Sequence, residues 1–226
     1  MALATCWAVV PRPSTSLRHA QLCSSLQSCH FPTHACRASS SSKAETRLAR
    51  DDLLDLIQTE ERGLKTQHNA NKRAHILEAI EALGVVGRDQ TTTDDALSAT
   101  WRMLWTTEKE QLFIIDKSPL FGTQAGDILQ VIDVQKGTLN NVITFPPSGS
   151  FVVDSTIEVV SKQRVNFRFI GAALFVNGRR IAVPPFGKGW FESVYLDESI
   201  RVAKDIRGDY LVVDRAPYDW NSPAAA

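Results

Sequence analysis

The sequence predicts a mainly β fold, a lipocalin-like antiparallel β-barrel preceded by a helical hairpin. The first reason is that apolar and polar residues alternate from residue 97 onward, as in half-buried strands. The second is that helical periodicity is confined to residues 45–90. The third is that about eight short strands follow one another in a meander-like order. Closing such a sheet removes its exposed edges, which favours a barrel over a sandwich.

Residues 1–44 form a separate segment with four basic residues, no acidic residue and many serines. This composition is typical of an organelle transit peptide, with processing near Cys36-Arg37-Ala38. A secretory signal is the rival interpretation, because residues 2–10 are apolar, but no basic residue precedes them. A plain disordered tail is the remaining alternative.

Removal of this segment would leave a mature domain without any thiol. The residues that would leave with it are Cys6, Cys23, Cys29, Cys36, His19, His30 and His34, so that only His68 and His75 remain. We therefore expect no disulfide framework, no cysteine-ligated zinc and no cysteine nucleophile. The rest of the chain carries 21 basic and 25 acidic residues, which gives no reason to expect nucleic acid as a partner. No apolar run approaches the ~18 residues that cross a bilayer, so any membrane contact should be peripheral.

Two helices are expected in residues 45–90. The first covers residues 45–64, where Leu53 and Ile57 lie on one helical face. The second covers residues 72–83, with Asn71 as its cap and Gly84 as its end. We expect the pair to close one end of the sheet. The alternative is a face that docks on a membrane or a partner.

The strands occupy residues 91–217, and residues 218–226 form a C-terminal tail. Trp101, Met103 and Trp105 are expected on one face of the first strand. Asn177-Gly178 lies between two apolar runs and is a strong hairpin signal, because both central residues of such a turn take positive φ. The remaining strands are expected at 128–134, 139–145, 151–159, 165–169, 192–196, 200–204 and 210–214. Arg207-Gly208-Asp209 supplies the last turn.

The last hairpin also carries a family signature. Tyr195-Leu196-Asp197, followed by Arg201-Val202, the turn at Gly208 and Leu211-Val212-Val213, resembles the closing segment of the plastid-lipid-associated protein (fibrillin) family. Residues 97–107 resemble its first-strand signature, with Ala99 where glycine is usual and Trp105 where tyrosine is usual. The resemblance covers about residues 48–217. Within the family, the ending from Pro184 to Tyr218 resembles the small plastid-lipid-associated protein 8 type.

The resemblance implies a chloroplast protein associated with thylakoids or plastoglobules. Its implied action is to bind or sequester small hydrophobic molecules, namely isoprenoids, quinones, carotenoids or acyl lipids. One alternative is a structural coat or scaffold protein of lipid bodies or thylakoid membranes, with a filled barrel that holds no ligand. Another is an accessory subunit in plastid lipid metabolism. The oligomeric state is left open.

Five aromatic residues are expected near the barrel interior and are the candidate ligand contacts: Trp101, Phe151, Phe167, Phe169 and Trp190. Asp197 and Arg201 are expected to form an ion pair that braces the last hairpin, or to place a charge at the barrel mouth. The sequence lacks a nucleophile elbow, a phosphate-binding glycine loop and a His-Glu-x-x-His helix. We therefore expect no catalytic residue, no metal, no cofactor and no enzymatic activity.

Overall fold

The computed structural model describes residues 38–121, 124–184 and 187–221. Most of the expected transit segment, including every cysteine, lies outside the described residues, as does the end of the tail from residue 222. Helix α1 begins at Ala38 and so overlaps the last residues of that segment. The boundary at residue 44 stays a prediction.

The chain contains three α-helices and nine strands in its described part. The helices are α1 (Ala38–Ile57), α2 (Ala70–Gly87) and α3 (Lys109–Lys117), and short 3-10 turns lie at Glu61–Gly63, Lys65–Gln67, Asp95–Leu97 and Ser118–Phe121. The strands are β1 (Ala99–Thr106), β2 (Ile128–Asp133), β3 (Thr138–Phe145), β4 (Gly149–Val159), β5 (Arg164–Val176), β6 (Arg179–Val183), β7 (Lys188–Leu196), β8 (Ile200–Asp205) and β9 (Tyr210–Arg215).

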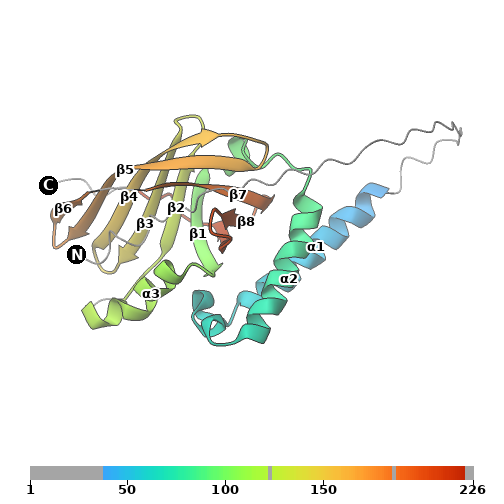
Figure 1. Cartoon of the computed structure of the whole chain (residues 1–226), viewed down its shortest axis with the longest axis horizontal. Helices are drawn as coiled ribbons and strands as arrows, with labels where there is room; N and C mark the ends of the chain where they lie inside the picture. Colours follow the sequence, from blue (N-terminus) through green and yellow to red (C-terminus); the bar gives the residue numbers. More distant parts are fainter. Residues whose placement is uncertain (1–37, 122–123, 185–186, 222–226) are drawn as a thin grey trace, which may run out of the picture.

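The strand pairings close into a ring. Every pair is antiparallel, and the order β1-β2-β3-β4-β5-β7-β8-β9 returns to β1 through the β1–β9 pairing. Strand β6 lies outside the ring, because it pairs only with the second half of β5. The mainly β, barrel-like fold expected from the alternation is confirmed (Figure 1).

The β5–β6 hairpin forms where the sequence predicts it. Asn177 and Gly178 have φ of 51° and 72°, and the flanking residues Val176 and Arg179 pair directly. Both central residues are therefore in the left-handed region that a tight hairpin turn requires. Gly208, with φ of 85°, serves the turn between β8 and β9 in the same way.

The interior of the ring is apolar, but a bulge in β1 places one residue that was expected there, Trp105, on the outer face. Trp101 and Met103 are buried in the interior cluster. The pairing of β1 with β9 shifts register between Met103 and Trp105, so that Trp105 lies on the outer face with the helices. The expectation that all three share one face is wrong for Trp105, because one inserted residue reverses the alternation.

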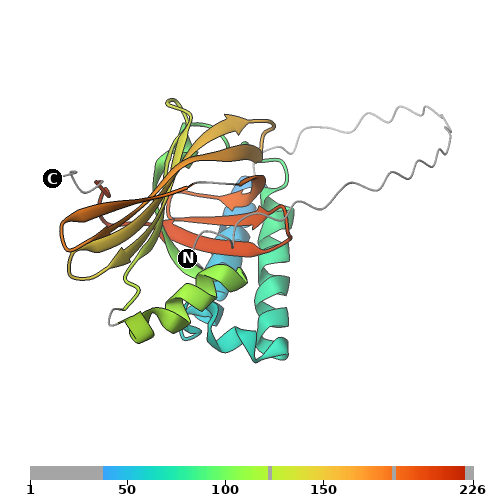
Figure 2. The same ribbon diagram turned by 60° about the vertical axis from the view of Figure 1, so that its left-hand side comes forward.

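Helices α1 and α2 pack against the outside wall of the ring rather than closing an end. Their apolar residues form one cluster with the outer faces of β1, β7, β8 and β9: Leu53, Ile57, Ile76, Ile80 and Leu83 with Trp105, Tyr195, Ile200, Val202 and Val212. The expectation of an end plug is therefore wrong. Figure 2 shows both helices alongside the strands.

The limits of α2 also differ from the predicted ones. The side chain of Asn69, not Asn71, caps the helix by accepting a hydrogen bond from the Lys72 backbone. The helix continues past Gly84 to Gly87, where it lies close to β7: a Cβ at Gly87 would stand 2.3 Å from the carbonyl oxygen of Val194. Gly87 permits this close packing because it has no Cβ. Gly84 does not end the helix.

One end of the ring is covered by α3, a helix that the sequence interpretation did not include. Leu112 and Ile115 point from it into the interior cluster. Because all pairs are antiparallel, the same end carries the β3–β4, β5–β6 and β8–β9 turns. We call this end the mouth end (Figure 1).

Candidate functional site

A cavity of about 220 Å³ lies inside the ring at the mouth end. Its apolar lining comes from β3, β5, β7, β8 and β9: Leu139, Phe167, Phe191, Ala203 and Leu211. Its polar lining includes the amides of Gln130 and Asn141. Ligand pockets are commonly about 300–1,000 Å³, so this cavity suits a small molecule or one end of a larger one.

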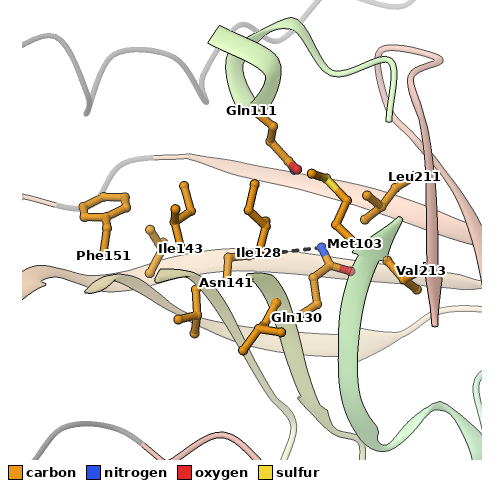
Figure 3. A pocket seen from close by; sticks show the side chains of 12 residues that line it. Met103, Gln111, Ile128, Gln130, Asn141, Ile143, Phe151, Leu211 and Val213 are labelled. Carbon is orange, nitrogen blue, oxygen red and sulfur yellow. Dashed lines mark hydrogen bonds between the residues drawn. The ribbon is translucent and has the colours of Figure 1, made fainter. Parts of the chain in front are cut away.

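The interior beyond the two amides is nearly filled. A void of about 20 Å³ lies there, which has room for about one water molecule. Figure 3 shows Met103, Ile128, Ile143 and Phe151 around it, with Gln111 reaching in from α3. Gln130 and Asn141 line both spaces, so the amide pair separates the cavity from the packed part of the core.

Arg201 is a fully buried cation on the inner side of β8. Its Nη2 donates to Gln130 Oε1, and its Nη1 donates to Ser193 Oγ at 3.5 Å. Its guanidinium carbon lies 5.2 Å from the ring centre of Phe191 and 5.6 Å from that of Trp101. Burial lowers the pKa of Arg201 to about 9, so the side chain remains charged at neutral pH.

No carboxylate among the described residues forms an ion pair with Arg201, and its Nε has no hydrogen-bond partner there. A buried charge without a counter-charge costs several kcal/mol, of which the two aromatic rings offset only a part. The barrel interior therefore holds an uncompensated positive charge.

The opening of the cavity is lined by a charged group that we call the rim: Glu108, Glu110, Asp205, Arg207 and Asp209. Arg207 binds Glu110 at 2.7 Å and Asp205 at 3.1 Å. These bonds join the start of α3 to the β8–β9 turn.

Glu108 is the buried member of the rim. Its Oε2 accepts a hydrogen bond from Gln111 Nε2 at 2.9 Å and lies 3.8 Å from Arg207 Nη2. Burial, assisted by repulsion from Asp205, raises the pKa of Glu108 to about 8. The carboxyl group is therefore mainly protonated at neutral pH.

The structure brings four of the five expected aromatic residues together. Trp101, Phe151, Phe167 and Phe169 face the interior, where the rings of Phe167 and Phe169 stack with centres 5.3 Å apart. Phe167 lines the cavity and Phe151 lines the smaller void. Trp190 lies elsewhere: it is on the opposite face of β7 from Phe191, under the guanidinium of Arg164 at 4.1 Å.

Asp197 and Arg201 are not brought together. Asp197 lies in the β7–β8 turn, where its Oδ1 accepts from the backbone amides of Ser199 and Ile200 at 2.7 and 2.8 Å. Its Oδ2 accepts from Tyr195 and pairs with Arg50 of α1 at 3.4 Å. Asp197 thus braces the corner without Arg201, whose side chain enters the ring.

The sequence interpretation did not select Gln130, Asn141, Phe191 or Glu108. Two of them had a visible signal, because Gln130 falls between Ile128 and Ile132 and Asn141 between Leu139 and Ile143. An amide at an inward position of an apolar stripe is expensive unless it has partners. Such positions point to a polar spot inside a barrel.

The described residues lack two further features. They contain no group of three or more histidine, cysteine, aspartate or glutamate side chains that could hold a metal ion. None of their helices is both long and apolar enough to cross a membrane.

These features define a class: a small antiparallel β-ring protein with an internal, partly polar cavity. The chain belongs to the PAP/fibrillin family, whose model matches residues 47–214. It is 65% identical over 172 residues to a protein of Arabidopsis thaliana named "Probable plastid-lipid-associated protein 11, chloroplastic". The matched region covers 76% of this chain and 81% of the relative. The kinship expected from the motifs is confirmed, although this relative bears the number 11 and not 8. No solved structure matches.

Proposed function

We propose that this plastid-lipid-associated family member binds a small hydrophobic molecule inside the ring, in the chloroplast, at the surface of thylakoids or plastoglobules. The observation that carries the proposal is the cavity of about 220 Å³ with its apolar lining. The name of the Arabidopsis relative supports both the lipid and the chloroplast. The action is sequestration and includes no catalytic step.

The cavity size limits what can enter. Each buried methylene contributes about 0.8 kcal/mol, so a short stretch of chain is enough for useful affinity. The space suits one end of an isoprenoid, quinone, carotenoid or acyl lipid, while the rest of the molecule passes the rim. Shape and depth then decide affinity more than any single polar contact.

Filling the cavity should abolish most of the binding. Ala203→Leu adds a branched side chain at the cavity wall on β8, where Ala203 is 4% exposed. We expect affinity for a fluorescent acyl probe to fall about tenfold or more, since two or three methylenes of the ligand lose their place. Titration of the full-length protein with the probe measures this.

Ala182→Leu is the matched control, because it adds the same volume on exposed strand β6. It should leave probe affinity unchanged. Equal affinities of Ala203→Leu and the wild type would contradict binding in the cavity. Such a result would favour the scaffold alternative, which the packed half of the interior supports.

The β5–β6 arm, residues 170–183, offers a membrane-docking surface beside the mouth. The register places Val176, Arg179 and Ile181 on one face, where Val176 is 38% and Ile181 50% exposed. Arg179 and Arg180 have no acidic partner among the described residues, and the arm itself contains none. Exposed apolar side chains beside free cations suit an anionic lipid surface.

Reversing the charges of Arg179 and Arg180 should weaken this docking. Each basic residue near an anionic surface contributes about 1 kcal/mol, so Arg179→Glu with Arg180→Glu should lower binding to vesicles with anionic lipid by tenfold or more. Co-sedimentation measures it. The charge-matched control changes two exposed arginines at α2, Arg73→Glu within the helix and Arg88→Glu directly after it, and should bind nearly as the wild type does. An equal loss in both variants would contradict docking through the arm.

A further inference from the structure

We propose that the bound molecule carries a carboxylate, which lies at the inner end of the cavity against Gln130 and Asn141 and supplies the counter-charge of Arg201. The ligand class is therefore an acidic amphiphile, such as a long-chain fatty acid. This inference rests on the proposed binding function and adds the chemistry of the head group. Two independent features carry it: the direction of the hydrogen bonds, and the charge.

The hydrogen-bond direction follows from arginine, which has donors only. The oxygen of Gln130 must face Arg201, so its Nε2 faces Asn141 and donates to Asn141 Oδ1 at 3.0 Å (Figure 3). The Asn141 oxygen is thus used. In the part of the chain that the structure describes, Asn141 Nδ2 has no hydrogen-bond partner, although Asn141 lines the cavity. The chain of hydrogen bonds therefore ends in a donor at the cavity, Asn141 Nδ2, to which a ligand can present an acceptor.

The buried charge of Arg201 favours one kind of acceptor group on the ligand. Arg201 is completely buried and has no carboxylate partner in the described residues, and its bond to Gln130 polarises the amide that donates to Asn141. A neutral carbonyl would satisfy the donor but leave the charge uncompensated. An anionic head satisfies both. Arg201 acts through Gln130 and is therefore a positioning residue.

The remaining lining agrees with a chain that leads from this head to the opening. Leu139, Phe167 and Leu211 give the cavity an apolar wall, and the amide pair and the rim line the same cavity. At the rim, Glu108 is mainly protonated at neutral pH, and Arg207 is held by Glu110 and Asp205. The chain of the acid would lie along the apolar wall and leave past α3.

The test compares three molecules with the same chain at pH 7: dodecanoate, its methyl ester and dodecanol. Affinity for the full-length protein is measured by calorimetry. The wild type should bind dodecanoate at least about tenfold more tightly than the ester, and Arg201→Met should remove that preference. Arg73→Met, a substitution of an exposed arginine on α2, should keep it. Arg201→Lys should restore part of it.

Gln130→Glu gives a second test that does not remove the cation. The new carboxylate would pair with Arg201 inside the ring, so the thermal midpoint should rise while the preference for the acid disappears. A preference that survives in Arg201→Met or Gln130→Glu would overturn the inference, as would equal affinities of the wild type for acid and ester. Equal affinities would leave the proposed function standing. Failure of all three molecules to bind would overturn both.

Discussion

Asp197→Ala is expected to lower the free energy of unfolding by about 3 kcal/mol, because it removes a carboxylate that holds two backbone amides and the side chains of three residues. Burial opposes the ionised form, but the hydrogen bonds from Ile200, Ser199 and Tyr195 hold the pKa of Asp197 below its usual value. The contribution is therefore fully present above about pH 4 and is lost as the pH falls further. Denaturant unfolding at pH 7 and pH 3 measures both effects.

Ligand affinity should not change in this variant at temperatures where it is folded. Asp197 lies in the β7–β8 turn, at the end of the ring opposite the mouth. Glu198→Ala, at the exposed neighbouring position, should alter stability by less than about 0.5 kcal/mol. A folded Asp197→Ala protein with weakened acyl binding would contradict the structural role and would show that Asp197 contributes to ligand binding.

Glu108→Gln is expected to stabilise the protein increasingly as the pH rises. Burial raises the pKa of Glu108 to about 8 in the folded chain, against about 4.3 when unfolded. Between these values unfolding releases a proton from Glu108, so the stability of the wild type falls with pH by up to about 1.4 kcal/mol per unit. Glutamine cannot ionise, yet it can still accept the hydrogen bond from Gln111.

The stability difference between Glu108→Gln and the wild type should thus be small near pH 4.5, grow toward pH 8 and then level off. Thermal unfolding at half-unit intervals from pH 5 to pH 9 measures the slope. Glu78→Gln, on the exposed side of α2, is the control and should differ from the wild type by less than about 0.5 kcal/mol. A constant difference across the range would show that Glu108 is ionised in the folded protein.

The sequence was sufficient for the strands because period-two alternation and a turn with two positive φ residues are local signals. The positions of single side chains were harder to predict. Trp105 leaves the interior through a bulge after Met103, and bulges leave little trace in one sequence. At Trp190, the choice between adjacent aromatic residues depends on the register of β7 with β5, which places Phe191 inside.

Helix α3 and the polar interior were missed for a related reason. The apolar run from Leu112 to Ile115 is too short for its pattern to distinguish a helix from a strand. The helix is explained only by the folded ring, whose end it covers. Arg201 looked like a partner for Asp197 because the two are close in sequence. Strand alternation instead turns Arg201 inward, where Gln130 and Asn141 from distant strands meet it.

Native mass spectrometry of the protein isolated from plastids, wild type beside Ala203→Leu, decides whether the ring is a binding site. The wild type should carry a hydrophobic adduct of lipid mass that survives transfer to the gas phase, and Ala203→Leu should have lost most of it. A wild-type protein without an adduct, or an adduct kept equally by both proteins, would contradict binding inside the ring.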